Sequence, residues 1–134
     1  MSKDWYQDIV DFLTRVRHDT IPQYPQMPDS RKLVLAKKLI NEEVNEELLP
    51  ALDKGDLVAI ADGGVDAIVV ILDAMVFCGI DIRPIWDVIH KSNMAKEGGA
   101  VREDGKLLKP EGWQAPDVRS EIMAQMSRES TGAS

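Results

Sequence analysis

Five acidic residues lie on two segments that are otherwise rich in aliphatic side chains: Glu42, Glu43, Glu46, Asp62 and Asp66. An α-helix turns by about 100° per residue, so Glu42 and Glu46 share one stripe with leucines before and after them. The opposite arc carries lysine and asparagine, which places the acids on the inward side. An unpaired charge there is costly, and carboxylate oxygens suit Mg²⁺ or Mn²⁺ better than zinc. We therefore predict an acidic metal site in which the glutamates face the aspartates.

The main alternative is that these acids are solvated surface, where glutamate pairs on helices are usually found. Two features favour the metal site. The glutamates interrupt an apolar face, and acids recur on a second apolar segment, where Asp62, Asp66 and Asp73 share one stripe and repel unless a cation or proton intervenes. Gly63 and Gly64 weaken that helix by about 1 kcal/mol each relative to alanine, which predicts a close approach of another backbone or a ligand. For Asp73 we prefer a hydrogen bond to another subunit.

Other chemistries find less support. A carboxylate di-iron bundle needs Glu-x-x-His pairs, and the nearest pattern is Asp87-x-x-His90. No serine or cysteine lies in an activating context, and the chain has no glycine-rich phosphate loop. Phosphate chemistry with several metal ions is the natural use of an all-carboxylate site, because metal-held water attacks phosphorus while the metals neutralise the leaving group.

Length and composition restrict the class of protein. The chain has 134 residues, is 44% apolar and only 5% aromatic, which favours a single domain of aliphatic helices. A net charge of −7 argues against a nucleic-acid polymer as partner, although a nucleotide bridged by metal ions is compatible with it. Cys78 is the single cysteine, so no internal disulfide forms. We expect no signal peptide, because the first residues lead directly into an amphipathic helix. We expect a cytoplasmic protein, in a bacterium or a phage-infected host.

The apolar pattern predicts an all-α fold. Three prolines prevent helix formation in the connector between the first two helices, and Pro50 should kink or end the second helix. The third helix is apolar nearly all round, but its aspartates argue against a membrane span. The hairpin of the second and third helices is too apolar to bury both of its faces within so small a chain. We therefore expect a homodimer or homotetramer to complete the bundle. The expected elements are helices at about residues 3–17, 30–50, 57–78 and from 82 onward, a basic loop at 96–117, and a partly disordered tail at 118–134.

A family resemblance accompanies these residues. Glu42-Glu43-x-x-Glu46 followed by an aspartate-bearing apolar helix resembles the all-α, MazG-like nucleoside triphosphate pyrophosphohydrolases, especially their short, phage-type (MazZ-like) branch. The similarity covers most of residues 33–117. It continues through Gly55-Asp56-Leu57, Ala61-Asp62-Gly63, Phe77-Cys78-Gly79-Ile80-Asp81, His90-Lys91-Ser92-Asn93-Met94-Ala95-Lys96, Arg102-Glu103-Asp104-Gly105-Lys106 and Lys109-Pro110-Glu111-Gly112-Trp113.

The resemblance implies a MazG-like helical domain at residues 1–117, with Mg²⁺ or Mn²⁺ as cofactor and a nucleotide as substrate. It implies that Glu42, Glu43, Glu46 and Asp62 are the metal carboxylates, the three glutamates being the catalytic set. One departure is Ala59, because the family pattern has glutamate three residues before the aspartate. We expect Asp66 to supply the missing ligand, or the site to hold fewer metal ions.

The resemblance also implies that Asn93 contacts the base or sugar and that Lys96 contacts phosphate. We add Lys91, Trp86 and Arg102 as candidate substrate-binding residues, each with a plainer alternative: solvated lysine, core tryptophan and a charge that keeps a loop soluble.

The predicted activity is conversion of a nucleoside triphosphate, such as dGTP or dATP, to the monophosphate and pyrophosphate. The alternatives are hydrolysis of dUTP or phosphoribosyl-ATP by the same chemistry, or a non-catalytic helical interaction module.

Overall fold

The structure is a computed structural model that describes residues 3–130. It confirms the all-α prediction, because the described residues form helices and no strand beyond one isolated bridge between Val101 and Leu107. The chain divides into two compact units, one ending at Ile80 and the other beginning at Asp81. Each unit is described by itself.

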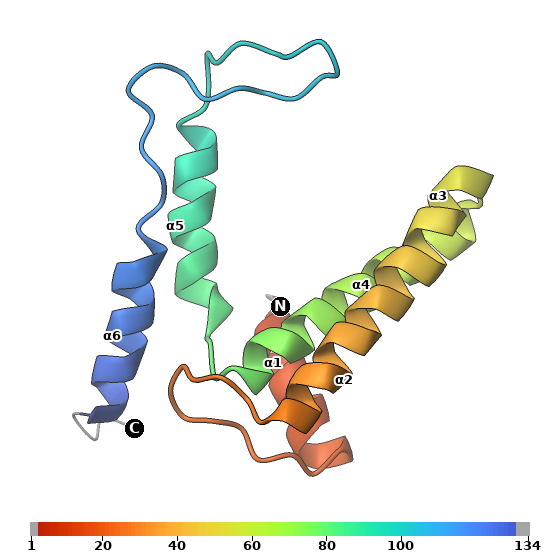
Figure 1. Cartoon of the computed structure of the whole chain (residues 1–134), viewed down its shortest axis with the longest axis vertical. Coiled ribbons are helices and arrows are strands. Elements are labelled where there is room, and N and C mark those ends of the chain that lie inside the picture. The colour runs from red at the N-terminus through yellow and green to blue at the C-terminus, as the bar shows by residue number, and fades with distance from the viewer. Residues whose placement is uncertain (1–2, 131–134) are drawn as a thin grey trace. The chain divides into compact units, whose positions relative to one another are not determined.

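The first unit is built around one long helix, α4 (Leu57–Phe77), against which the other helices pack (Figure 1). Between residues 3 and 56 the chain forms α1, a short π-helix η1, α2, a second π-helix η2, and α3. Leu13 and Val76 are fully buried and mark the centre of this core. The bounds are α1 Trp5–Asp11, η1 Phe12–Val16, α2 Ser30–Ile40, η2 Asn41–Leu48 and α3 Leu49–Lys54.

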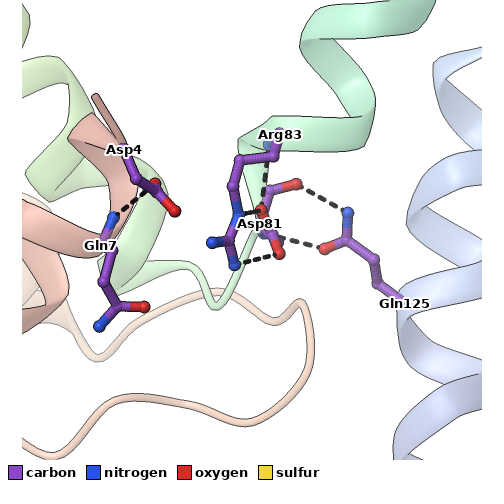
Figure 2. Close-up of polar contacts among 5 residues, drawn as sticks. All are labelled: Asp4, Gln7, Asp81, Arg83 and Gln125. Carbon is purple, nitrogen blue, oxygen red and sulfur yellow. Dashed lines mark hydrogen bonds and ion pairs between the residues drawn. The ribbon is translucent and has the colours of Figure 1, made fainter. Parts of the chain in front are cut away.

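Aspartate caps fix where four helices begin, because a carboxylate can accept hydrogen bonds from the unpaired N–H groups of the first turn. Asp4 accepts from the Gln7 amide at 3.0 Å (Figure 2). Asp29, Asp56 and Asp81 cap α2, α4 and α5 (Ile82–Met94) in the same way. The caps agree with the expected helix starts at residues 30, 57 and 82.

The helix that carries the glutamates continues through Pro50, where a kink or an end was predicted. Its middle part, η2, has i→i+5 hydrogen bonds, and the Leu49 amide donates to the Val44 carbonyl. A proline in an α-helix clashes with the carbonyl four residues earlier, and the wider turns of η2 stand directly before Pro50. The helix then ends at Gly55, which adopts φ +69° as a left-handed cap.

The connector before α2 packs against the C-terminal end of α4. The Gln26 amide donates to the Cys78 carbonyl at 2.8 Å. Gly79 adopts φ +67°, and a Cβ at this position would overlap the Tyr24 carbonyl. A glycine is therefore required here both for its backbone conformation and for space.

The second unit consists of α5 (Ile82–Met94), a long loop and α6 (Val118–Ser130). Gln125 joins the two helices, because its side chain accepts from the Asp81 amide and donates to the Asp81 carbonyl, both at 2.9 Å (Figure 2). Helix α6 falls where the sequence predicts a tail; residues 131–134, the end of that tail, lie outside the described residues. No helix within residues 3–130 has the length and apolar character needed to cross a membrane.

Candidate functional site

The predicted acidic residues lie on two helical segments that pack against each other, η2 and the first half of α4 (Figure 1). Gly63 makes the close approach that its sequence context predicts. A Cβ on Gly63 would lie 3.4 Å from the Leu48 Cα atom, whereas one on Gly64 would meet only the end of the Leu48 side chain, at 4.0 Å. The two backbones thus come close together beside Glu47 and Asp62, the neighbours of Leu48 and Gly63 in the sequence.

Glu43 is the centre of this acidic cluster, which we define as Glu42, Glu43, Glu46, Glu47, Asp62 and Asp66. The pKa of Glu43 is raised above its ordinary value by partial burial and then by the charges of Asp66, Glu47, Glu42 and Asp62. The structure therefore brings residues of the two segments within electrostatic reach of each other. Glu47 was not predicted, although it lies one helical turn after Glu43 and its spacing could have indicated it.

The cluster is more exposed than predicted. Glu42 and Glu43 are half-buried, whereas Glu46, Asp62 and Asp66 are exposed. The predicted placement of Glu46 on the inward side is therefore wrong. The prediction used α-helical geometry, and the wider turns of η2 rotate the glutamates away from the stripe that continues the leucines. The Asn41 side chain donates to Glu46 across five residues at 3.3 Å, which matches the π-helical spacing.

The carboxylate side chains of the acidic cluster are of a type that suits a metal ion, although their present geometry is not that of a metal site. Within residues 3–130 no three side chains of His, Cys, Asp or Glu are arranged to hold one. The donors are nevertheless all carboxylates, as Mg²⁺ and Mn²⁺ prefer, and a cation would relieve the repulsion that raises the pKa of Glu43. Ala59, three residues before Asp62, lies in the first turn of α4 and offers no ligand atom.

Asp73 shares a helix with the aspartates of the cluster but has different surroundings. It is buried, and its Oδ1 atom has no hydrogen-bond partner among the described residues. Burial raises its pKa, while nearby Arg17 and Lys32 lower it and Asp19 raises it. Asp19 in turn pairs with Lys32 at 2.7 Å and with Arg17 at 3.3 Å.

A small pocket of about 180 Å³ lies beside this ion group, between the connector, α2 and the end of α4. Asp19, Lys32 and Phe77 contribute to its wall, together with prolines and a methionine of the connector. The Lys32 ammonium, which could otherwise receive an anion, is already paired with Asp19. No residue of the acidic cluster lines the pocket, so we do not assign it to the predicted chemistry.

The predicted substrate-binding residues all belong to the second unit. Asn93 and Lys91 are exposed, and Trp86 is 64% exposed rather than part of a core. Arg102 is occupied by Asp104, with two N–O contacts of 2.9 and 2.6 Å, and this pair raises the pKa of Arg102. The Lys96 ammonium lies 5.4 Å from the centre of the Trp113 ring. Sequence reasoning did not single out Trp113 as a contact of Lys96.

Comparison with known proteins supports the chemistry that the acids suggest. No curated protein matches the chain. A model of the phosphoribosyl-ATP pyrophosphohydrolase family matches residues 10–93, which include the whole acidic cluster and more than half of the chain. That family lies within the MazG-like nucleotide pyrophosphohydrolases, so the resemblance holds at the level of the superfamily. The chain therefore belongs to the phosphoribosyl-ATP pyrophosphohydrolase family, whose members are hydrolases acting on phosphoric anhydride bonds.

Proposed function

We propose that the protein is a Mg²⁺- or Mn²⁺-dependent hydrolase that converts a nucleoside triphosphate to the monophosphate and pyrophosphate. The observation that carries the proposal is the electrostatic contact of Glu43 with acids from both η2 and α4, within the segment that matches a pyrophosphohydrolase family. A divalent cation that binds carboxylates on two neighbouring helices would relieve the repulsion between them.

In this proposal Glu42, Glu43, Glu46, Asp62 and Asp66 hold the metal, with Asp66 replacing the ligand absent at Ala59. When bound, the metal supplies Lewis acidity toward phosphoryl oxygens and lowers the pKa of a bound water. The chain contributes the spacing of the two acidic segments, which the Gly63–Leu48 contact sets. Asp62 and Asp66 are exposed and make no hydrogen bond within residues 3–130, so they are free to turn toward the ion. Glu46 is also exposed, but it would first have to release the Asn41 amide.

For the substrate, a purine deoxynucleoside triphosphate such as dGTP or dATP is the first candidate, from the branch that the sequence resembles. Phosphoribosyl-ATP is the second, and the family match favours it. Both present a purine and a polyphosphate, so the same cluster serves either. Asn93 and Lys96 remain the predicted contacts to nucleoside and phosphate.

The decisive experiment measures pyrophosphate release from dGTP, dATP, dUTP and phosphoribosyl-ATP with Mg²⁺ or Mn²⁺. Loss of an outer partner of a metal ligand typically costs about 10–100-fold in affinity or activity, so Glu43→Gln is expected to cost at least that. Asp53→Asn is the matched control, because Asp53 is exposed on α3 and is not among the charges that shift the pKa of Glu43. Turnover of none of the four nucleotides with either metal would refute the proposal.

Mn²⁺ binding separates this enzyme from the non-catalytic alternative without a substrate. A ligand that binds the native state raises its thermal stability. Mn²⁺ should therefore raise the melting temperature of the wild type, and Glu46→Ala should reduce that rise. An equal rise in both proteins would indicate a helical module that holds no metal at this cluster.

We also propose that the protein is a homo-oligomer. Helix α4 leaves several aliphatic side chains uncovered in the single chain, with Val58 80%, Val65 61% and Ile68 42% exposed. Exposed apolar residues repeated along one helix indicate a protein–protein contact, and a second copy of α4 offers a surface of the same kind. Light scattering on a size-exclusion column tests the mass in solution.

A further inference from the structure

Two lysines far apart in the sequence meet at one aromatic ring in the second unit. The ammonium groups of Lys96 and Lys109 lie 5.4 and 4.8 Å from the centre of the Trp113 ring. Lys96 follows α5, whereas Lys109 follows the hairpin formed by residues 99–108. The arrangement lies beyond the segment matched by the family model, which ends at residue 93, so the family match assigns it no role.

A hydrogen bond to the backbone holds the indole ring of Trp113 in place. The Trp113 Nε1–H donates to the Ser92 carbonyl at 2.7 Å, and Ser92 is buried. The hairpin is closed by a hydrogen bond from the Leu108 amide to the Ala100 carbonyl at 2.7 Å. Gly99 lets the two arms approach, since a Cβ there would overlap the Leu108 carbonyl. Both lysines are therefore brought to the ring by ordered backbone.

The two charges lack an acidic partner within residues 3–130. Because both distances are measured to one ring centre, the ammonium groups lie within about 10 Å of each other, which is about one Debye length at 0.1 M salt. An exposed cation–π contact stabilises a lysine ammonium by only about 0.5–1 kcal/mol. Arg102, on the same hairpin, differs because Asp104 neutralises it. An anion is thus the missing partner of Lys96 and Lys109.

We propose that Lys96 and Lys109, both held at the Trp113 ring, form a binding site for the polyphosphate group of the nucleotide. Two ammonium groups suit a compact, multiply charged anion, which lysine binds as a point charge. The inference rests on the proposed function and adds Lys109 and Trp113 to the substrate-binding residues. It also removes Arg102 from them, because Arg102 is committed to Asp104.

The test uses pyrophosphate and no metal, so that it does not depend on hydrolysis. Trp5→Phe and Trp86→Phe leave Trp113 as the only tryptophan. Titration of this protein with pyrophosphate in EDTA should change the Trp113 fluorescence to saturation, with calorimetry as a second readout. Lys96→Ala and Lys109→Ala should each weaken binding about tenfold, whereas Lys109→Arg should bind close to the parent. Lys106→Ala, an equal loss of charge on the same hairpin, should leave the affinity unchanged.

The outcomes separate this site from the proposed function. Tight pyrophosphate binding that depends on Lys109, without turnover of any nucleotide, would support the site and refute the enzyme. Turnover with an unchanged KM in Lys109→Ala, together with unchanged pyrophosphate affinity, would overturn the site and leave the enzyme intact. Equal losses in Lys106→Ala and Lys109→Ala would show a general charge effect, which also overturns the site. Absence of pyrophosphate binding by both readouts would do the same.

Discussion

Gly63 offers the sharpest test of how the fold positions the acidic cluster. It sits inside α4, and its neighbour Gly64 provides a matched control in the same helix. Valine at either position has the same helix propensity, so the intrinsic cost cancels between the two variants. What differs is the space: a Cβ on Gly63 would face the Leu48 backbone at 3.4 Å, whereas a Cβ on Gly64 would face only the end of a rotatable side chain.

The expected magnitudes follow from these distances. A methyl group at residue 63 lies in ordinary van der Waals contact, so Gly63→Ala and Gly64→Ala should each stabilise the protein by about 0.5–1 kcal/mol through helix propensity. Valine at residue 63 must place a further carbon against the backbone of η2. Overpacking of this kind costs about 1–3 kcal/mol, so Gly63→Val should be less stable than Gly64→Val by that amount.

Urea unfolding gives the stabilities, and pyrophosphate release with Mn²⁺ gives the functional consequence. Because Gly63→Val pushes η2 away from α4, it should lower the rate and reduce stabilisation by Mn²⁺, whereas Gly64→Val should retain both. Equal stability of the two valine variants would refute the close approach. A clear difference in stability with identical activity would refute the claim that the Gly63–Leu48 contact sets the spacing of the acids.

Three further predictions concern the rest of the fold. Because burial raises the pKa of Asp73, the native state holds its proton to higher pH than the unfolded state. The contribution of Asp73 to stability therefore falls as pH rises from the unfolded pKa to the native one. In urea unfolding, Asp73→Asn should gain stability relative to wild type as pH rises through this window, and a pH-independent difference would refute this. Alanine at a left-handed position is expected to cost about 1–2 kcal/mol. Gly55→Ala should cost this amount, because no atom lies within 4 Å of its Cβ, and Gly79→Ala should cost more. Equal melting temperatures of the two variants would contradict the contact with Tyr24. Val65→Glu should convert the proposed oligomer to monomer in sedimentation equilibrium, and an unchanged mass would exclude this face of α4.

Local sequence signals predicted most of the helices, because each depends on a few neighbouring residues. Asp29, Asp56 and Asp81 mark helix starts, and Gly55 marks a helix end. Pro50 does not end the helix, since a proline is tolerated when the preceding turns are π-helical. Helix α6 was missed because its apolar stripe is weak, and its connection to α5 runs through Gln125, a long-range contact without a local pattern.

The acidic cluster could be predicted in composition but not in exposure. Spacing identified Glu43 and Asp66 as partners, and the charge of Asp66 does raise the pKa of Glu43. The same spacing placed Asp73 with them, yet Asp73 lies near Arg17 and Lys32. The spacing of residues along a helix predicts which side of the helix they share. It does not predict which neighbouring element each residue contacts, because different elements pack against different parts of the same side.

The number of basic residues is a poor guide to where phosphate binds in an acidic protein. Lys32 lies 4.6 Å from the Phe77 ring centre, much as Lys96 and Lys109 lie on Trp113. Asp19 neutralises Lys32, however, so that an incoming anion would have to displace a carboxylate at a cost in both hydrogen bonding and charge. Within residues 3–130, no carboxylate forms an ion pair of this kind with the lysines at Trp113. A ligand of several negative charges should therefore prefer ordered cations without an acidic partner, and their pairing, rather than their number, predicts the site.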